Sequence, residues 1–342
     1  MLKNKKILCI GPSDKLVTGQ YKSFKLTSKL LGAIVIHNDF SNIFGFVLYY
    51  FNLLKVSAFS NLDVIYFTNS RTRLGFYARD LILIALFPSR KLIYHLHGND
   101  FHLFYNTGNL IDRFFVRYFY KKINSCITPS DIATAFIKDN LNGSLNVYSI
   151  PNVPDDLVYD PSYKTKTKTT LLFFSNITVD KGILEFLDLV RILNIKNAER
   201  FDFHVVGKLI DDFVFTSFDF DANNVFFHGP IYDKYELSRI LSSTDIHFFP
   251  STYATELYPI CLIESALCNN YVISNRIGAV DELLSGMQST IYDDYQTDKS
   301  EICDIIMNFK SSNSVIENNI IAGSKFCIFE YENKLSEAIN GI

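Results

Sequence analysis

The chain has 342 residues, more than one hydrophobic core usually supports, so two domains are expected. Hydrophobic residues make up 48% of the chain and charged residues 20%, which excludes a disordered or fibrous protein. The formal net charge of -3 lacks the basic excess of a nucleic-acid-binding domain, so no nucleic-acid partner is expected. The six cysteines have no paired spacing and several lie in apolar runs, which fits a reducing cytosol.

The first apolar run, ILCI, is too short for the core of an export signal and leads directly into Gly11 and Pro12. It is therefore predicted to be a first strand. The longest apolar region, residues 42–59, is interrupted by Gly45, Asn52 and Lys55. Because a membrane-spanning helix needs about 20 predominantly apolar residues, no such helix is predicted.

Short apolar runs then alternate with segments of helical length. The sequence predicts buried strands at KILCI, AIVIH, DVIYF, KLIYH, SCIT and NVYSI, and later at TLLFFS, DFHVVG, NVFFHG, DIHFFP and YVISN. Between the two series, residues 150–170 contain three prolines and a Lys/Thr run, the composition of a linker. The fold class is therefore α/β, with two doubly wound parallel sheets.

The expected domains are an N-terminal domain at residues 1–153 and a second domain at residues 168–325. Residues 326–342 are expected to form a C-terminal helix, and its return to the first domain is left open. Two such domains would place the carboxyl ends of both sheets across one cleft, where this architecture binds ligands. The loop CIGPSDKLVTGQ has only Gly11 and Gly19, which argues against a dinucleotide fingerprint, and no phosphate-binding P-loop or metal-ligand spacing occurs.

The segment STYATELYPICLIES places Glu256 and Glu264 eight positions apart around an apolar run. It follows the predicted strand DIHFFP, and a helix is expected to begin near Pro259, a residue suited to the first helical turn. A helix N-terminus presents free N–H groups and partial positive charge, which suit a diphosphate, and flanking carboxylates can accept hydrogen bonds from sugar hydroxyls. The alternative is a solvated loop acid at Glu256 and a helix-surface acid at Glu264.

The other motifs of the second half of the chain favour the donor-binding interpretation of the two glutamates. In order and spacing, FFSNITVDKGILEFL, FHVVGKL, VFFHGPIYDKYELSRILSSTDIHFFPS, the segment with the two glutamates, and VISNRIGAVDELL resemble the carboxyl-terminal half of retaining glycosyltransferases of family 4. The resemblance extends more loosely to KLIYHLHGND in the first domain. It implies the two-domain fold called GT-B, in which two Rossmann-like domains face each other across a cleft.

Residue by residue, the resemblance implies that Glu256 contacts the transferred sugar and that Glu264 holds the ribose hydroxyls. Lys181, in VDKG, matches the family lysine on the phosphates. The chain departs from the family at Ser175 and Asn176, where a Gly-Arg pair is usual, so one phosphate-binding cation is missing. The alternative for Lys181 is a surface lysine in the first turn of a helix.

The resemblance implies further contacts with the donor from His97 in the first domain and from turn residues of the second. Gly19 is a candidate for close backbone approach to the phosphates, with a plain turn glycine as the alternative. For His97 the alternative is a packed or capping residue. The complete set of predicted donor-binding residues is Gly19, Ser175, Asn176, Lys181, Gly207, His228, Gly229, Tyr258, Pro259, Ile260 and Glu264, with His97, Glu256 and Lys181 in catalytic roles.

The family chemistry retains the anomeric configuration and needs no metal or other cofactor besides the nucleotide-diphosphate sugar, which is the donor substrate. The leaving diphosphate is expected to take the proton from the acceptor hydroxyl. Glu256 is expected to position the sugar, although retaining glycosidases use a carboxylate as nucleophile.

The acceptor is expected in the first domain, where cations alternate with aromatic residues. Such helices suit an anionic bilayer, at which polyprenyl-linked glycans would be met. The alternative is that the aromatics pack inward and the cations are only solvated. The cations concerned are Arg71, Arg73, Arg79, Arg113, Arg117, Lys121 and Lys122.

The sequence therefore predicts a cytoplasmic retaining glycosyltransferase, peripheral on the inner face of the plasma membrane if the cations meet lipid. Its acceptor would be a glycan or lipid-linked oligosaccharide in surface polysaccharide synthesis, such as O-antigen or capsule. Two other functions remain open: a nucleotide-sugar epimerase or hydrolase on the same fold, and a non-catalytic glycosyltransferase-like subunit.

Overall fold

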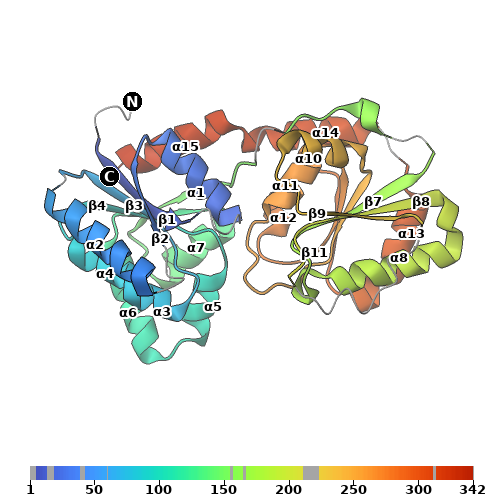
Figure 1. The fold of residues 1–342 in the computed structure, drawn as a ribbon. Coiled ribbons are helices and arrows are strands. Elements are labelled where there is room, and N and C mark those ends of the chain that lie inside the picture. Colours follow the sequence, from blue (N-terminus) through green and yellow to red (C-terminus); the bar gives the residue numbers. More distant parts are fainter. Residues whose placement is uncertain are drawn as a thin grey trace. The chain divides into compact units, whose positions relative to one another are not determined.

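The computed structural model describes residues 5–13, 19–38, 43–59, 61–154, 157–164, 167–210, 223–310 and 313–341. The chain forms two compact units. Unit 1 consists of Met1–Val153 and Ile328–Ile342, and unit 2 of Pro154–Cys327. Each unit has its own parallel sheet and its own hydrophobic core (Figure 1).

The sheet of unit 1 has six parallel strands in the order β2-β1-β3-β4-β5-β6. The central strands are almost fully buried, because helices cover both faces of the sheet. The strand bounds are β1 Ile7–Pro12, β2 Ile34–Asn38, β3 Val64–Thr68, β4 Lys91–His95, β5 Ser125–Thr128 and β6 Asn146–Ser149.

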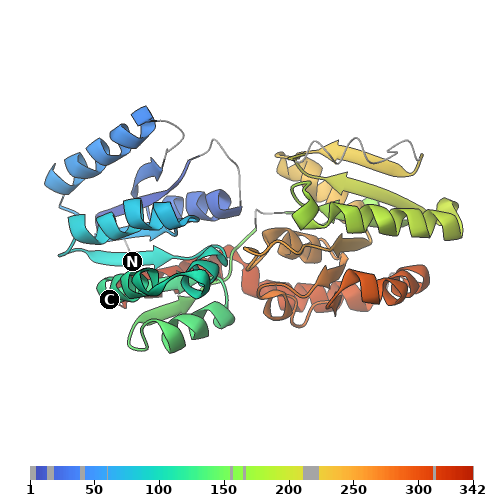
Figure 2. The ribbon, with the colours of Figure 1, turned by 90° about the horizontal axis from the view of Figure 1, so that it is seen from below.

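The helices of unit 1 form two layers. Side chains of α2, α4, α6 and α7 share one core cluster on one face of the sheet, whereas α1 and α15 share another on the opposite face (Figures 1 and 2). The bounds are α1 Gly19–Leu30, α2 Ile43–Phe59, α3 Arg73–Gly75, the π-helical turn η1 Phe76–Asp80, α4 Leu81–Leu86, α5 Asp100–Thr107, α6 Leu110–Lys122, α7 Asp131–Asn140 and α15 Ile328–Asn340.

The C-terminal helix α15 belongs to unit 1. Tyr331 is buried in the same cluster as Phe24, and its hydroxyl lies 2.6 Å from the Thr27 hydroxyl on α1. Lys5 donates a hydrogen bond of 2.9 Å to the carbonyl of Ile339. The last residues of the chain therefore complete one face of the first sheet.

The sheet of unit 2 also has six parallel strands, in the order β12-β11-β10-β7-β8-β9. Helices α8 and α13 cover one face, and α10 packs on the other. The strand bounds are β7 Thr169–Phe174, β8 Phe201–Val206, β9 Val225–Gly229, β10 Ile246–Phe249, β11 Tyr271–Asn275 and β12 Ser289–Tyr292.

The helical elements of unit 2 begin with η2, a short turn in the segment predicted to be a linker. Within that segment, the backbone N–H groups of Val158 and Asp160 donate to the hydroxyls of Ser238 and Ser242 on α10, so these residues are tied to unit 2. The bounds are η2 Pro161–Tyr163, η3 Val179–Lys181, α8 Ile183–Asn197, η4 Ala198–Arg200, α10 Lys234–Ser243, α11 Ile260–Leu267, α12 Val280–Leu283, α13 Tyr295–Asn308, α14 Asn313–Gly323 and η5 Ser324–Phe326.

The predicted fold class, α/β with two doubly wound parallel sheets, is confirmed. Eleven of the twelve strands coincide with the predicted runs. The strand that the sequence analysis missed is β12, which has only four residues at the edge of the sheet and is half-buried over most of its length. A short edge strand of this kind lacks the continuous apolar run that marks its neighbours.

One cation of the predicted basic surface lies inside unit 1, so that part of the prediction is wrong. Arg79 is buried and its guanidinium contacts the carboxylate of Asp80 at 2.7 Å. Burial raises the pKa of Asp80, and the charge of Arg79 opposes this shift. Ser70 and Tyr94 also donate to this carboxylate, so the pair is satisfied within the core.

In the part of the chain that the structure describes, no helix combines the length and the apolar character that crossing a membrane requires.

Candidate functional site

The residues predicted to bind the donor follow neighbouring strands of unit 2. Ser175 and Asn176 follow β7, Gly207 follows β8, Gly229 ends β9, and the loop of residues 250–259 follows β10. Because these strands are parallel, their carboxyl ends meet at one edge of the sheet, the position at which doubly wound sheets bind ligands. The structure therefore brings these segments together at one edge.

Lys181 ends the turn η3, which follows β7. The hydroxyl of Thr178 caps this turn by accepting a 3.3 Å hydrogen bond from the backbone N–H of Lys181. The backbone N–H of Thr252 donates to the carbonyl of Asp180 at 2.9 Å, which ties η3 to the loop after β10. The two segments that carry Lys181 and Glu256 are thus held side by side.

Two glycines permit the close approach of backbone segments at this edge. Gly182 has a φ of +82°, and a Cβ there would overlap the carbonyl of Pro250. Gly207 has a φ of +154°, and a Cβ there would overlap the carbonyl of Ser175. L-residues rarely adopt these conformations, so glycine is required at both positions.

The side chains of Lys181 and Glu256 form an ion pair, although 75 residues separate them in sequence. The ammonium also lies 4.4 Å from the centre of the Tyr253 ring, within range of a cation–π interaction. The two charged side chains are 16% and 14% exposed, so the pair is largely screened from water but still accessible. A positive and a negative group are therefore available side by side for a polar ligand.

Glu264 lies in α11 and is only 2% exposed, which excludes the alternative of a helix-surface acid. Burial raises the pKa of the Cys261 thiol, and the charges of Glu256 and Glu264 raise it further. The charge of Lys181 opposes this shift.

Helix α11 begins at Ile260, one residue after the predicted start, and Pro259 is its N-cap. Pro259 has no N–H to donate, and Tyr258 before it is buried against the ring of Phe326. The first turn of α11 presents backbone N–H groups that no capping side chain occupies. These groups, with the helix dipole, favour an anionic group near Ile260.

His228, one of the predicted donor-binding residues, already contacts His204 within the fold. Its Nε2 lies 2.8 Å from Nδ1 of His204, and the two rings stack at a centroid distance of 5.0 Å. Burial lowers the pKa of both histidines, to about 4 for His204. At neutral pH this pair is therefore uncharged, and it lies across strands β8 and β9 near the edge of the sheet.

In unit 1, His97 follows β4 and its ring lies against that of His95, with ring centroids 4.0 Å apart and an angle of 32° between the ring planes. Its backbone N–H donates to Oδ1 of Asn69 at 3.0 Å. Burial lowers the pKa of His97 to about 3, against the opposing effect of the Asn152 side chain. His97 is therefore a neutral ring at the carboxyl edge of the first sheet, and His95 is held by the Tyr66 hydroxyl.

Gly19 is the first residue of α1, and residues 14–18 before it lie outside the described residues. Among the residues that the structure describes, no three His, Cys, Asp or Glu side chains gather in a way that would hold a metal ion.

Sequence reasoning did not identify Tyr253 or Cys261 as parts of this site. Both lie within the segment that carries the two glutamates, and this position in the sequence was the only sign that they could belong to the site. Aromatic and thiol side chains in an apolar segment are usually core residues, and only the packing shows that Tyr253 meets Lys181.

Comparison with known proteins bears directly on this arrangement. Residues 168–306 match the family model described as Glycosyl transferases group 1. Among solved structures, Anabaena HepE in complex with UDP-glucose is 17% identical, with 99% of this chain and 100% of that one covered and a TM-score of 0.69. Sucrose-phosphate synthase from Thermosynechococcus elongatus is 10% identical over 98% and 99% of the two chains, with a TM-score of 0.76. A glycosyltransferase from Rickettsia africae is 16% identical over 99% and 100%, with a TM-score of 0.67.

No curated protein sequence matches the chain. The two doubly wound sheets and their structural neighbours define the fold as GT-B. Residues 168–306 are a glycosyl transferases group 1 domain, and the chain is a glycosyltransferase.

Proposed function

We propose that the protein is a retaining glycosyltransferase that transfers a hexose-type sugar from a nucleotide-diphosphate donor. The observation that carries this proposal is the Lys181–Glu256 pair beside the N-terminus of α11, with Glu264 buried in the same helix. A diphosphate needs cations and N–H donors, and a sugar needs hydroxyl acceptors. Both kinds of group are present at this edge of unit 2.

In the proposed reaction, the bond between C1 of the sugar and the phosphate oxygen breaks, and a bond from C1 to the acceptor oxygen forms on the same face. The acceptor proton passes to an oxygen of the leaving diphosphate. Lys181 stabilises the negative charge that develops on the diphosphate, and the N-terminus of α11 does the same. Glu256 orients the sugar through its hydroxyls, and Glu264 holds the ribose. The donor contact that the resemblance implies for His97, a neutral ring of unit 1 because burial lowers its pKa, stays a prediction.

Besides orienting the sugar, Glu256 also positions Lys181 through the ion pair. Its carboxylate pairs with the Lys181 ammonium, and Tyr253 supports this position. When a diphosphate binds, the ammonium gains a stronger anionic partner, and the carboxylate becomes free to accept sugar hydroxyls. The pair therefore pre-organises both groups and limits the reorganisation that donor binding requires.

The acceptor that we propose is a glycan or a polyprenyl-linked oligosaccharide in surface polysaccharide synthesis, on the cytoplasmic side of the membrane. The base of the donor is the first unknown to test. Anabaena HepE has been solved with UDP-glucose and with UDP, which makes uridine diphosphate sugars the first candidates. The departure at Ser175 and Asn176 leaves the phosphates with one cation fewer than the family pattern, so Lys181 carries a larger share of their charge.

The test is a thermal-shift screen with UDP-, GDP- and ADP-sugars, because a ligand that binds only the folded state raises its stability. We expect one nucleotide series to stabilise the protein, and Lys181→Ala to abolish most of that shift. Lys168→Ala is a matched control, because Lys168 also forms an ion pair, with Asp202 at 2.8 Å, but at the amino ends of β7 and β8. If none of the nucleotide sugars stabilised the protein, the result would favour the non-catalytic glycosyltransferase-like subunit.

Turnover separates the remaining candidates. We expect transfer to depend on an acceptor and the product to keep the anomeric configuration of the donor, which nuclear magnetic resonance of the purified product measures. Rapid consumption of the donor without an acceptor would favour an epimerase or hydrolase. A product of inverted configuration would refute the retaining mechanism and leave the transferase class intact.

A further inference from the structure

Helix α2 of unit 1 is apolar on both its inner and its outer side. Its inner side packs on the sheet through Tyr49 and Leu53, which are buried. Its outer side exposes large apolar side chains, with Phe44 at 76% and Phe51 at 62% exposure. The other exposed apolar residues of this helix are Ile43, Phe46, Val47, Leu48 and Leu54.

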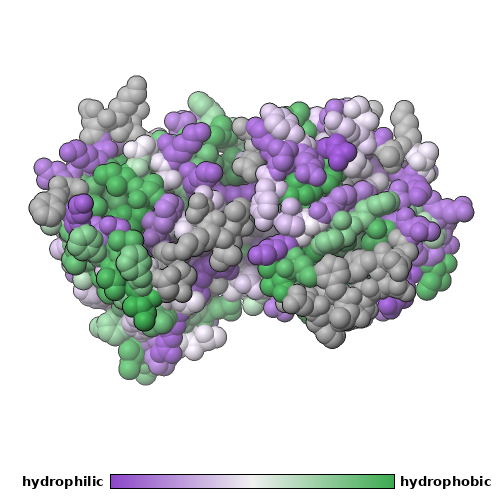
Figure 3. Space-filling model, viewed as in Figure 1, coloured by the Kyte–Doolittle hydropathy of each residue, from purple (hydrophilic) through white to green (hydrophobic). Residues whose placement is uncertain are grey.

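This exposed surface continues beyond α2. Ile34 and Val35 of the edge strand β2 are also exposed, and β2 contacts α2. Figure 3 shows apolar residues gathered on this face of unit 1, over α2 and the helices next to it. A helix that is apolar all round is normally buried in a core or in lipid, and a large exposed apolar patch marks an interaction site.

The charges near this surface are of one sign. Helices α2, α3, α4 and α6, with η1, contain two acidic residues, Asp80 and Asp112, and both are buried. Asp112 is neutralised by Arg73 at 2.8 Å and accepts a hydrogen bond from Tyr77. The exposed cations on these helices are Lys55, Arg73, Arg113, Arg117, Lys121 and Lys122.

The two units differ sharply in net charge. Unit 1 contains 19 Lys and Arg against 11 Asp and Glu, a formal net charge of +8. Unit 2 contains 14 Lys and Arg against 25 Asp and Glu, a formal net charge of -11. The overall charge of -3 therefore conceals a basic unit that carries the apolar surface.

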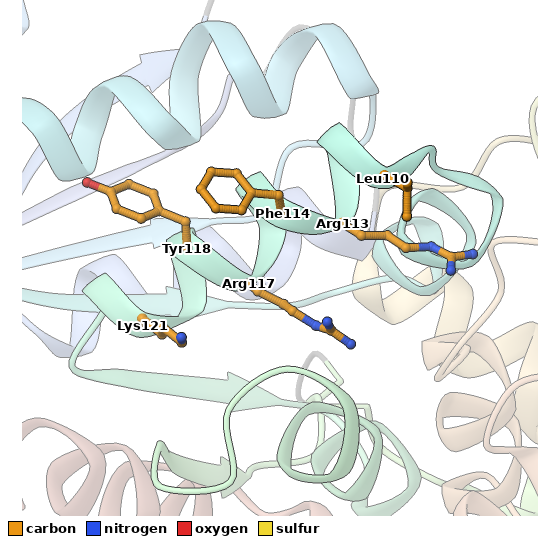
Figure 4. Close-up of a pocket in the computed structure, with 6 residues that line it drawn as sticks. All are labelled: Leu110, Arg113, Phe114, Arg117, Tyr118 and Lys121. Atoms are coloured by element: carbon orange, nitrogen blue, oxygen red, sulfur yellow. The ribbon is translucent and has the colours of Figure 1, made fainter.

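Helix α6 combines both kinds of side chain along one groove of about 370 Å³. One row of cations and one row of apolar side chains run along the helix at four-residue spacing, and Figure 4 shows Arg113 and Arg117 pointing to one side and Phe114 and Tyr118 to the other. The residues that line the groove are Leu110, Arg113, Phe114, Arg117, Tyr118 and Lys121.

We propose that the face formed by α2, α4 and α6 docks unit 1 on an anionic lipid bilayer, with the outer side of α2 immersed among the acyl chains and the cations of α6 at the phosphate groups. Charge complementarity selects this occupant. A bilayer surface offers apolar depth and a dense layer of negative charge together. The described helices of this face offer the complement, because neither of their two acids, Asp80 and Asp112, is exposed. Immersion of α2 supplies the apolar contribution, and α6 supplies the electrostatic one.

This inference goes beyond the transfer reaction and depends only on the surface of unit 1. The first experiment is co-sedimentation of the whole protein with vesicles of phosphatidylcholine containing about 30% phosphatidylglycerol, without donor or acceptor. We expect binding that weakens as salt rises from about 50 mM to about 500 mM, because salt screens the cations, and that stays measurable because the apolar contacts are not screened. A failure here would not affect the nucleotide-sugar screen, so the two proposals fail separately.

Immersion of α2 can be measured directly because the chain has no tryptophan. Phe51→Trp places a single fluorophore on the outer side of α2. Ile195→Trp is the matched control, since Ile195 is an exposed apolar residue on α8 of unit 2. On addition of anionic vesicles, we expect a blue shift and quenching by brominated acyl chains for Phe51→Trp and neither for Ile195→Trp.

Substitutions separate the two contributions. Arg117→Gln with Lys121→Gln should weaken vesicle binding about thirtyfold, because each cation near an anionic surface contributes about fivefold. Val47→Gln with Phe51→Gln should weaken it by about a hundredfold at all salt concentrations, because each buried apolar side chain contributes about tenfold or more. Lys138→Gln on α7 is the control for the cations and should change little.

Three results would overturn the proposal. One is absence of binding to anionic vesicles at low salt. Another is equal quenching at Phe51→Trp and Ile195→Trp. The third is a dimer in solution that Val47→Gln with Phe51→Gln converts to monomers, because the apolar face would then belong to an interface with a second copy of this chain.

Discussion

Replacement of Lys181 by alanine separates a role in the reaction from a role in the fold. The ammonium makes two contacts within the fold: its ion pair with Glu256 and its position 4.4 Å from the centre of the Tyr253 ring. A partly exposed ion pair stabilises by about 1 kcal/mol or less, and an exposed cation–π contact by about 0.5–1 kcal/mol. The expected cost to the free energy of unfolding is therefore about 1–2 kcal/mol.

A loss of this size lowers the melting temperature by several degrees, about 2–4 °C per kcal/mol for a domain of this size, and leaves nearly all molecules folded at 25 °C. Loss of one electrostatic stabiliser of a transition state, by contrast, costs about a hundredfold to a thousandfold in rate. We therefore expect Lys181→Ala to lower kcat/KM by about a hundredfold or more. Initial-rate kinetics with radiolabelled donor sugar measures this, and thermal unfolding measures the cost in stability.

The control is Lys168→Ala, which removes a more exposed ion pair, 37% and 22% exposed, from the opposite edge of the same sheet. It should keep kcat/KM within about a factor of two, since it touches none of the proposed donor contacts. The double variant Lys181→Ala with Glu256→Gln should lose less than the product of the single losses, because the two residues contact each other and one donor. Activity of Lys181→Ala within a factor of two of the wild type would remove the lysine from the site.

Three further predictions test other parts of the structure. Glu264→Gln should raise KM about tenfold and leave kcat largely unchanged, the signature of a contact made equally in ground and transition states, whereas a fall in kcat alone would contradict the ribose role. Gly207→Ala should destabilise unit 2 by about 3 kcal/mol or more in thermal unfolding, while Gly229→Ala, where a Cβ meets nothing within 4 Å, should cost about 1 kcal/mol; equal losses would argue against the backbone overlap. Burial lowers the pKa of His247 to about 3, below its value of about 6.5 in the unfolded chain, so the unfolded state binds more protons between these values and stability falls as pH decreases from 6.5 towards 3. His247→Phe should remove about 2 kcal/mol of the destabilisation between pH 7 and pH 5 in denaturant titrations, and an unchanged pH dependence would exclude this histidine.

The architecture was largely predictable from the sequence because buried parallel strands leave a continuous apolar run at each position. β4 and β10 coincide with KLIYH and DIHFFP for this reason. β12 was missed, although β6, another four-residue strand at a sheet edge, was predicted.

The candidate site was predictable where motif residues follow a strand directly. Lys181 was assigned to the phosphates of the donor and Glu256 to the transferred sugar, and their direct ion pair was not predicted. The reason is topological: β7 and β10 are neighbours in the sheet although 75 residues separate the two side chains in sequence, and local pattern carries no information on strand order.

Hydrophobic periodicity and turn chemistry are local properties, so they were enough to predict every described strand except β12. Which apolar and charged side chains face water became clear only from the packing of the elements against one another. Arg79 was indistinguishable from Arg117 in sequence, yet the first is buried against Asp80 and the second is exposed. The sequence analysis concluded only that the interrupted apolar region 42–59 does not span a membrane, whereas the structure shows that α2 packs on the sheet through its stripe at Tyr49 and Leu53. Burial depends on what the opposite side of each helix meets, and that is settled by contacts between elements distant in sequence.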